Sequence, residues 1–488
     1  MQGSPSQGGQ SVHKDTLTVA LYGEPDNLNP YGQSHEAAHI ANNVCYERLI
    51  RKDLNGEIIP WLATEWEMTD DVTLHLVLRD DVTFHNGSKF TAEDVAYSLT
   101  CLAESSFTSN LFGSIDTEAF DIVSDYELNV KLQYPNAAFI EALASTRGLM
   151  VSKDYFENGA TEDINRKPMG TGPMMFKEWV TGDHYSFTAY KGYWGDALAY
   201  DNVNFRFITE SSSRCIELET GGVDIAQQIA FSDWDRIEAN PDTNLVRGQT
   251  LGTRNLCFNM NQDFLKDINV RKALAYAIDL ETLVKVVWEG TCSVAAGYYS
   301  PEILGYKAVG PQEYNPELAK EYLARAGYTE ANPLKFNYYT YENTVNITFA
   351  EVLQQMWSEV GIQAEVKVTD LSSFTTMNNN AELTVSLLST TAAIPDPTAA
   401  LLIWPTTRTI SIRHNDQHVQ DLLDQAVSSY DPAEREATYG ELQSYLWEQF
   451  YAFPVCHPQE AYGCRSNVQN LPFYPNLVME LDRVTFSE

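Results

Sequence analysis

Hydrophobic and polar residues alternate over residues 17–22, which predicts a β-strand near the start of the chain. Two prolines and several turn-forming residues follow over 23–30, so this strand is expected to end in a loop. Apolar residues then recur at helical spacing over 35–49. The chain therefore opens with a strand, a loop and a helix.

A second alternating segment spans residues 74–78 and is followed by a turn at 80–81. This pattern predicts a β-hairpin whose second strand passes through Phe84. Further along, Thr91 and Asp94 have the spacing of a capping box. We expect a helix to begin directly after Thr91.

The second half of the chain alternates the signals of helices and strands. Helices are predicted from Val270 onward, from Asn315-Pro316 to Gly327, over 344–360, and from Asp431-Pro432 toward Phe450. A strand-like segment over 363–368 follows the turn at Gly361. This alternation predicts an α/β lobe with a largely parallel sheet.

The length and the linker pattern indicate how the lobes are connected. The chain has 488 residues, and a single hydrophobic core stops growing at roughly 250 to 300 residues, so at least two lobes are expected. The sequence contains neither a Ser/Gly linker nor a repeat. A chain that crosses between the lobes more than once, and that binds a ligand at their junction, fits this pattern best.

The composition is strongly acidic. The chain carries 67 acidic and 32 basic residues, a formal net charge of -35. Such a field repels nucleic acid and anionic lipid headgroups, so a nucleic-acid partner is not expected, although arginines in a cleft can still bind an anionic ligand. Solubility is the simplest explanation of the charge.

The N-terminal residues 1–15 are rich in Gly, Ser and Gln and lack the apolar core of a signal peptide. We interpret them as a flexible leader. It fits a tether that follows a signal or lipid-bearing segment, but a cytosolic protein with an irregular start would look the same. No apolar run is long enough to predict a membrane-spanning helix.

The seven cysteines do not form the close pairs that zinc sites use. Their odd number leaves at least one outside any disulfide framework. Cys456 and Cys464 are near enough in sequence to close a short disulfide loop, and this possibility stays open.

The segment from His35 to His39 matches the motif HExxH, in which two histidines bind zinc and the glutamate acts as a base. No third ligand is identifiable, so a helix that carries two histidines by coincidence is the alternative reading. His414 and His418 repeat the spacing and have the same alternative. Nucleophile-elbow, phosphate-loop and dinucleotide motifs are absent from the sequence. We therefore expect no enzymatic activity and no cofactor or metal.

A series of spaced segments resembles the family 5 extracellular solute-binding proteins, which are the dipeptide, oligopeptide and nickel-chelate receptors of ABC importers. The resemblance covers nearly the whole chain and keeps the family's order. Its segments are Glu47-Arg48-Leu49, Pro60-Trp-Leu-Ala63, Leu78-Arg79, Val82-Thr-Phe-His-Asn-Gly87, Thr91-Ala-Glu-Asp-Val95, Gly170-Thr-Gly-Pro173, Lys191-Gly-Tyr-Trp194, Gly222-Val-Asp224, Phe258-Asn259, Val270-Arg-Lys-Ala-Leu274, Ala277-Ile-Asp279, Tyr314-Asn-Pro316, Ala326-Gly-Tyr328 and Pro395-Asp-Pro397.

The resemblance implies a two-lobed α/β fold of the periplasmic-binding-protein type II, in its large peptide-receptor form. After the leader, lobe I would comprise 16–48, 168–254 and 458–488, with an inserted subdomain at 49–167, and lobe II would comprise 255–457. The implied protein is an extracytoplasmic receptor, periplasmic or at the cell surface, with a lipid anchor to the membrane as one option for its native form. It would be a monomer that delivers a small peptide or peptide-like nutrient to the permease subunits of an ABC importer.

The interlobe cleft of such a receptor must offer ring surface and a few oriented polar groups. An arginine there can bind a carboxylate through two parallel hydrogen bonds, although a structural ion pair is the alternative for each arginine and core packing the alternative for each ring. By chain position the ligand-binding candidates are Tyr31, Phe112, Arg147, Arg254, Thr390, Thr391, Ala393, Asp396, Trp404 and Arg408.

One position departs from the peptide-binding relatives, in which an Asp three residues before the Asp/Glu-Pro pair holds the ligand's amino group. Here Ala393 stands at that place. Either the ligand lacks a free amino end at this point, or another carboxylate, with Asp396 the nearest, replaces the anchor. A nickel-chelate or other metal-chelate receptor of the same fold is therefore an alternative. A zinc peptidase and an adhesion or sensor module are the rival classes.

Overall fold

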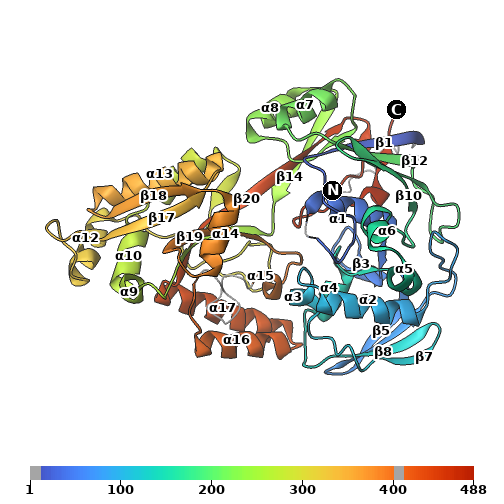
Figure 1. The fold of residues 1–488 in the computed structure, drawn as a ribbon, viewed down its shortest axis with the longest axis horizontal. Helices are drawn as coiled ribbons and strands as arrows, with labels where there is room; N and C mark the ends of the chain where they lie inside the picture. Colours follow the sequence, from blue (N-terminus) through green and yellow to red (C-terminus); the bar gives the residue numbers. More distant parts are fainter. Residues whose placement is uncertain (1–11, 34, 401–411) are drawn as a thin grey trace, which may run out of the picture. The chain divides into compact units, whose positions relative to one another are not determined.

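A computed structural model describes residues 12–33, 35–400 and 412–488. The chain divides into two compact units, one of Met1–Gly248 with Glu460–Glu488 and one of Gln249–Gln459 (Figure 1). The first unit is therefore discontinuous in sequence. The finer division expected from the sequence, with an inserted subdomain at 49–167, stays a prediction.

The main sheet of the first unit is mixed. Its strands follow the order β10 (Met174–Val180), β11 (His184–Ala189), β12 (Tyr200–Phe207), β1 (Lys14–Leu21), β13 (Ile225–Ala226) and β20 (Ala452–Arg465), with β14 (Thr243–Gln249) also paired to β20. Strand β1 is parallel to β12 on one side and to β13 on the other. The carboxyl ends of these three strands therefore meet at one edge of the sheet.

Strand β1 is the predicted opening strand, and its apolar positions explain its central place. Leu17, Val19 and Leu21 are fully buried. Ala20 belongs to an apolar cluster with residues of α7 (Ser211–Glu219) and α8 (Phe231–Ala239), helices that lie near one end of the sheet (Figure 1).

The predicted hairpin over 74–84 is wrong in its second strand. Strand β6 (Thr73–Leu78) forms as expected, but it pairs with β5 (Ala63–Asp70) and β8 (Glu127–Lys131), and β7 (Asp121–Ser124) completes this four-stranded antiparallel sheet. Residues 79–84 form no strand; Thr83 makes a single bridge to Lys89. The pairing of β6 depends on contacts with segments that are distant in sequence, such as β8. Local alternation of apolar and polar residues does not reveal such partners.

The helices of the first unit begin where the sequence predicts. The helix α1 (Glu36–Cys45) follows the first loop, and α2 (Ala92–Glu104) begins with the predicted capping box of Thr91 and Asp94. The smaller elements are α3 (Ser109–Phe112), α4 (Phe139–Ala144), α5 (Lys153–Asn158), α6 (Thr161–Arg166), β2 (Glu47–Arg48), β3 (Ile50–Lys52), β4 (Ile58–Pro60), β9 (Leu149–Met150), β21 (Val468–Gln469), β22 (Thr485–Phe486) and a 3-10 turn at Leu481–Arg483.

The second unit has a sheet that is less parallel than the sequence predicts. Strand β15 (Gly252–Phe258) is antiparallel to β19 (Val385–Thr391) and to β20, and β16 (Cys292–Val294) is antiparallel to β20. Among the described strands of this unit, only β17 (Lys335–Tyr341) and β18 (Gln363–Thr369) form a parallel pair, and they lie in a separate two-stranded sheet. The crossover helix α13 (Thr344–Glu359) joins that pair.

The predicted helices of this unit are confirmed. Asn315 caps α12 (Pro316–Arg325) by accepting a hydrogen bond from Leu318 N at 3.0 Å, and Gly361 has the positive φ of +90° that ends α13. The remaining helices are α9 (Asp263–Lys266), α10 (Ile268–Tyr276), α11 (Leu280–Trp288), α14 (Leu371–Asn379), α15 (Pro397–Ala400), α16 (Gln417–Ser428) and α17 (Pro432–Gln449). Helix α13 lies along β17 and β18 (Figure 1).

Strand β20 also excludes one disulfide. Cys456 and Cys464 both belong to this strand, and at about 3.3 Å per residue their separation far exceeds the reach of a disulfide. All seven cysteines are present as thiols. The possibility left open by their spacing is therefore wrong.

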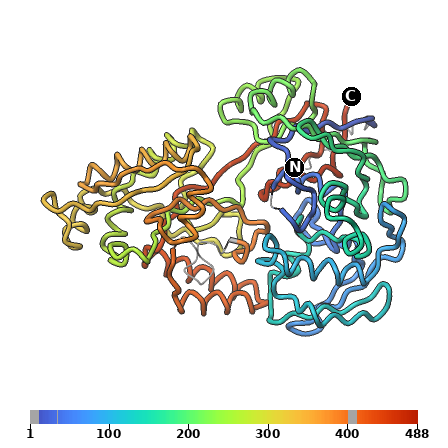
Figure 2. The backbone as a smooth tube through the Cα atoms, viewed as in Figure 1, coloured from blue at the N-terminus to red at the C-terminus, as the bar shows by residue number. Residues whose placement is uncertain are grey.

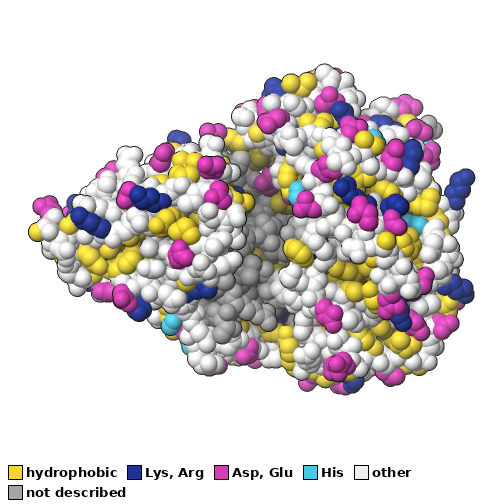
Figure 3. All heavy atoms as spheres, in the orientation of Figure 1, with side chains coloured by type: hydrophobic (Ala, Val, Ile, Leu, Met, Phe, Trp, Pro, Cys, Tyr) yellow, Lys and Arg dark blue, Asp and Glu magenta, His cyan; other side chains and the backbone are white. Residues whose placement is uncertain are grey.

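The first and last described segments of the chain lie together in the first unit. Val12 N donates to Phe486 O at 2.9 Å, and the tube in Figure 2 shows the two ends of the coloured chain in this unit. Acidic side chains are scattered over the visible face of the molecule with basic ones among them (Figure 3). Among the described residues, no helix is long and apolar enough to cross a membrane.

Candidate functional site

A polar cluster of the first unit lies at the carboxyl ends of the parallel strands β1 and β13. Tyr22 directly follows β1, and Gln227 directly follows β13. Tyr22 N donates to Gln227 Oε1 at 3.3 Å, so the two strand ends are joined. In open α/β sheets, ligands bind outside the carboxyl ends of the strands, which makes this edge a candidate site.

Glu36, the glutamate of the HExxH motif, is held by the glutamines at this edge. Its carboxylate accepts a hydrogen bond from Gln227 Nε2 at 2.6 Å and another from Gln228 Nε2 at 3.4 Å. The pKa of Glu36 is raised to about 7, mainly by burial and also by the charge of Glu460, against the lowering effects of the glutamine hydrogen bonds and Arg147. The carboxyl group is therefore poised to titrate near neutral pH.

The two histidines of the motif have separate partners. His35 is the N-cap of α1, because its Nδ1 accepts from Ala37 N at 3.3 Å, and its ring stacks on Tyr22 with centroids 5.0 Å apart. Burial lowers the pKa of His35. His39 is 2% exposed, and its ring contacts the guanidinium of Arg147.

Each histidine of the motif therefore has a protein partner in the structure. Among residues 12–33, 35–400 and 412–488, no group of three or more His, Cys, Asp and Glu side chains is arranged to hold a metal ion. His414 and His418 do not share a helix, since α16 begins at Gln417. Their rings pack against Tyr451 and Tyr445.

Among the predicted site residues, Arg147 has a guanidinium with a lowered pKa and a contact to the His39 ring. Burial lowers the pKa of its guanidinium to about 10, and the charge of Glu36 opposes this effect. Its Nη1 contacts the His39 ring, and within the described part of the chain no ion pair joins Arg147 to a carboxylate. A half-buried, partly desolvated guanidinium of this kind is suited to bind the carboxylate of a solute.

Tyr462 adds a hydroxyl near this cluster. Burial raises the pKa of Tyr462, and the charges of Glu36 and Glu460 raise it further. Its ring stacks on Phe473 at 5.6 Å, and its buried hydroxyl makes no hydrogen bond with a described residue. A buried hydroxyl without a partner is unfavourable, so a ligand group that bonds to it is expected to gain affinity.

Tyr31 and Phe112 are held in the interior of the first unit. The hydroxyl of Tyr31 donates to Leu149 O at 2.7 Å, and its ring packs against Phe156. Phe112 is fully buried at the end of α3. These contacts favour the packing alternative for both rings over ligand contact.

In the second unit the structure brings three predicted residues to one pair of strands. Gly252 is opposite Thr391, Thr253 is opposite Thr390, and Arg254 is next along β15. Thr391 is exposed and Thr390 half-buried. Arg254 donates to Cys292 Sγ at 3.2 Å and lies 5.2 Å from the Trp288 ring centroid. By this register, Arg254 and Thr391 lie on one face at the end of the β15–β19 pair, and Thr390 lies on the other.

Asp396, the predicted substitute for the missing amine anchor, already has a cationic partner. Its carboxylate is 3% exposed, accepts from Arg435 Nη2 at 2.7 Å and caps the short α15 through Thr398 N at 3.0 Å. Its charge is already neutralised inside the unit, which disfavours that branch of the sequence hypothesis, and the ligand role of Asp396 stays a prediction. Ala393 is half-buried beside it in sequence. Trp404 and Arg408 lie outside the described residues.

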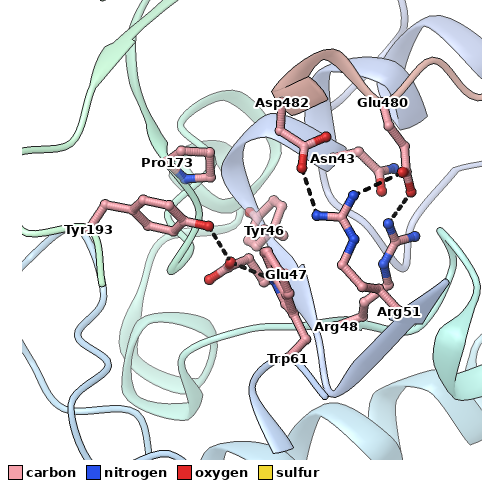
Figure 4. A pocket seen from close by; sticks show the side chains of 10 residues that line it. All are labelled: Asn43, Tyr46, Glu47, Arg48, Arg51, Trp61, Pro173, Tyr193, Glu480 and Asp482. Atoms are coloured by element: carbon pink, nitrogen blue, oxygen red, sulfur yellow. Dashed lines mark hydrogen bonds and ion pairs between the residues drawn. The ribbon is translucent and has the colours of Figure 1, made fainter. Parts of the chain in front are cut away.

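A small pocket of the first unit, separate from the polar cluster, has a structural role (Figure 4). Its volume is about 20 Å³, room for about one water molecule. Glu480 pairs with Arg48 and Arg51, and Arg51 also pairs with Asp482 at 2.6 Å. These pairs fix the C-terminal segment to β2 and β3.

The sequence analysis missed Gln227, Gln228 and Tyr462, and it considered Glu36 only as a catalytic base. The glutamines directly follow the short strand β13. A polar residue at the end of a predicted parallel strand is a detectable signal, but here the strand has only two residues. Tyr462 reaches the cluster from the far end of the chain, and no local pattern predicts that contact.

The comparisons with known proteins agree on one family. The model of "Bacterial extracellular solute-binding proteins, family 5 Middle" matches residues 57–411. The glutathione-binding protein of Shigella dysenteriae is 27% identical over 459 residues, which cover 90% of this chain and 88% of that protein. The nickel-binding periplasmic protein of Escherichia coli is 24% identical over 493 residues, covering 94% and 92%.

Solved structures show the same fold. The periplasmic binding protein DppA of Helicobacter pylori, in complex with the peptide STSA, superposes with a TM-score of 0.84. It is 24% identical to this chain and covers 98% of it and 99% of its own length. The two-lobed α/β fold expected from the sequence is thereby confirmed.

Proposed function

The chain belongs to the bacterial extracellular solute-binding proteins of family 5, and we propose that it captures a small peptide-like solute and delivers it to an ABC importer. The observation that carries the choice of ligand is Arg147, a half-buried arginine without a carboxylate ion-pair partner among the described residues. A peptide supplies that carboxylate at its C-terminal end. Two parallel hydrogen bonds to such a carboxylate would neutralise the half-buried charge.

The neighbours of Arg147 support the same ligand class. The carboxyl group of Glu36 can accept a hydrogen bond from a ligand amide when ionised and can donate one when protonated, and its raised pKa allows both near pH 7. The hydroxyl of Tyr462 can bond a peptide carbonyl or amide. A site with these three groups recognises polar backbone atoms rather than a purely apolar solute.

In the second unit, we propose Arg254, Thr390 and Thr391 as the contributing residues. Their strands β15 and β19 are rigidly paired over seven residues. Thr391 offers a hydroxyl at an exposed position. We keep three further residues in the proposed ligand-binding set, namely Ala393, Trp404 and Arg408. We propose that Tyr31 and Phe112 pack in the interior of the first unit and do not contact the ligand.

A metal-chelate receptor is the second candidate. The alanine at position 393, where peptide-binding relatives carry the amine anchor, favours a ligand without a free ammonium at that place. One relative in the comparison is a nickel-binding periplasmic protein. A chelate whose ligand carboxylates meet Arg147 would satisfy the same cluster.

The cellular setting follows from the family. We propose an extracytoplasmic location, with a lipid anchor or periplasmic release as the two forms, a monomeric state, and permease subunits of an ABC importer as the protein partner. We propose that no reaction is catalysed and that no resident cofactor is needed. The described lobes would correspond to lobe I at 16–48, 168–254 and 458–488 and lobe II at 255–457.

A thermal-shift screen tests the receptor function. A ligand that binds only the native protein stabilises it by RT ln(1 + [L]/Kd), about 2.7 kcal/mol at a hundredfold excess over Kd. We expect at least one peptide, modified peptide or metal chelate to raise Tm by several degrees. If none shifts Tm at millimolar concentration, with a site shown by mass spectrometry to be empty, the proposed function is wrong.

A further inference from the structure

Two cysteines of the second unit are neighbours across paired strands. Strands β16 and β20 place Cys292 opposite Pro458 and Val294 opposite Cys456. Because side chains alternate along strands, Cys292 and Cys456 lie on the same face of the sheet on a short diagonal. Both belong to one buried cluster. Burial raises the pKa of Cys456, and its interaction with the Cys292 thiol raises it further.

The guanidinium of Arg254 adjoins this pair. Arg254 is directly opposite Cys456 in the β15–β20 register, and its Nη1 donates to Cys292 Sγ at 3.2 Å. Its charge also acts to lower the pKa of Cys456. No ion pair between Arg254 and a carboxylate is found in the described ranges of the chain. A guanidinium in this position stabilises a thiolate, the reactive form of cysteine.

A pocket gives small molecules a route to one thiol of the pair. It has a volume of about 550 Å³ and is lined by residues of α11 and β16, including Lys285, Glu289, Val294 and Cys292 itself. Cys292 is 8% exposed, whereas Cys456 is 0% exposed. A reagent in the pocket therefore meets Cys292 first and reaches Cys456 only through it.

We propose that Cys292 and Cys456 form a redox-active pair that low-molecular-weight disulfides oxidise to an intramolecular disulfide. The Cys292 thiolate attacks one sulfur of the reagent RSSR, which forms a mixed disulfide and releases one thiol RSH after protonation. The Cys456 thiolate then attacks Cys292 Sγ, which closes the protein disulfide and releases the second RSH. Two protein thiols lose two electrons and two protons, and the reagent gains them.

The order of attack follows from the same contacts. Cys292 has both the open approach and the Arg254 hydrogen bond, which makes it the nucleophile. Once Cys292 carries the adduct, its thiol no longer raises the pKa of Cys456, and Arg254 is free to favour the Cys456 thiolate. Cys456 is thus the resolving cysteine.

Oxidation of the full chain with hydroxyethyl disulfide tests the proposal. Peptide mapping of the folded protein is expected to show one internal disulfide linking Cys292 and Cys456, reversible by dithiothreitol. The variant Cys456→Ser is expected to accumulate a stable mixed adduct at Cys292, and Cys292→Ser is expected to lose the internal disulfide. The control Cys464→Ser changes a buried thiol of the same strand and should behave as the unmodified chain.

Circular dichroism must show that each variant is folded. The proposal is overturned if native protein keeps both thiols reduced under conditions that modify the half-buried Cys101, or if the adduct at Cys292 persists although Cys456 is present. A disulfide that forms only after denaturation in urea also contradicts it. Ligand binding is not needed for any of these outcomes, so they are independent of the proposed function.

Discussion

The amide group of Gln227 donates a hydrogen bond to the carboxylate of Glu36 at 2.6 Å. This bond joins the start of α1 to the end of β13 and turns the glutamate of an HExxH match into part of a polar cluster with Arg147. Glu36 is therefore interpreted as a member of this polar cluster and not as the catalytic base of a zinc peptidase.

The raised pKa of Glu36 predicts a pH-dependent stability. The folded-state pKa of about 7 lies above the ordinary value of 4.5, so the folded protein binds the proton more tightly and the contribution of Glu36 to stability falls as pH rises between these values. The variant Glu36→Gln is therefore expected to melt at a higher temperature than the parent at pH 8, and the difference should shrink toward zero below pH 4.5.

Melting curves across pH check this, with Glu65→Gln as the control at an exposed position. The control should follow the parent profile. A Glu36→Gln profile that also runs parallel to the parent from pH 4 to pH 8 would refute the assignment of a buried, desolvated carboxyl group.

The pair of Asp396 and Arg435 predicts a stability effect rather than a binding effect. Their side chains are 5% and 8% exposed, and breaking a buried ion pair by removing one charge costs about 3–5 kcal/mol. We expect Asp396→Asn to lower the free energy of unfolding by that order in urea titrations. The exposed pair Arg325–Glu321 is the control, and Glu321→Gln should cost less than about 1 kcal/mol. A loss below that value for Asp396→Asn would contradict the structural role.

The alanine at position 393 predicts that binding does not depend strongly on a free amino group at the end of the ligand. With Asp396 already paired, a ligand ammonium at this place would lose its charged partner, at a cost of several kcal/mol. Acetylation of the amino end of a bound peptide is therefore expected to change Kd by less than about tenfold. The variant Ala393→Asp should favour the free peptide over the acetylated one. Calorimetry that shows a loss of about a hundredfold on acetylation in the parent chain would contradict this placement.

His35 is predicted to act as a helix cap and not as a metal ligand. Its Nδ1 accepts from Ala37 N, and loss of an N-cap typically costs about 1 kcal/mol. We expect His35→Ala to lower the free energy of unfolding by about 1 kcal/mol. The metal content should be the same in the parent chain and the variant, and neither protein should cleave peptides. Stoichiometric zinc that survives dialysis and disappears with a peptidase activity in His35→Ala would restore the zinc reading.

Local patterns predicted much of the fold. The capping box at Thr91, the cap at Asn315 and the stop at Gly361 are determined by residues next to one another, so the sequence reveals them. The pairing of β6 with β8 and the antiparallel sheet of the second unit depend on distant segments. Alternation alone does not choose such partners.

The site shows the same division. Arg147 could be proposed from its place in the chain and from the resemblance to a receptor family, but its lack of a carboxylate partner is visible only in the structure. Asp396 looked available because Arg435 is distant in sequence. Gln227 and Tyr462 join the cluster through the sheet, and no motif in the sequence predicts that contact.

The binding of a ligand carboxylate by Arg147 is tested most directly by calorimetric titration of one peptide, chosen by the thermal-shift screen, and its C-terminal amide. We expect the parent chain to bind the free carboxylate at least about 30-fold more tightly than the amide, equivalent to about 2 kcal/mol. The control variant Arg166→Ala removes a half-exposed arginine that lies over the Trp179 ring. It is expected to keep the same preference. Arg147→Ala is expected to bind both forms equally weakly. A folded Arg147→Ala variant that keeps the full preference for the carboxylate would contradict the account.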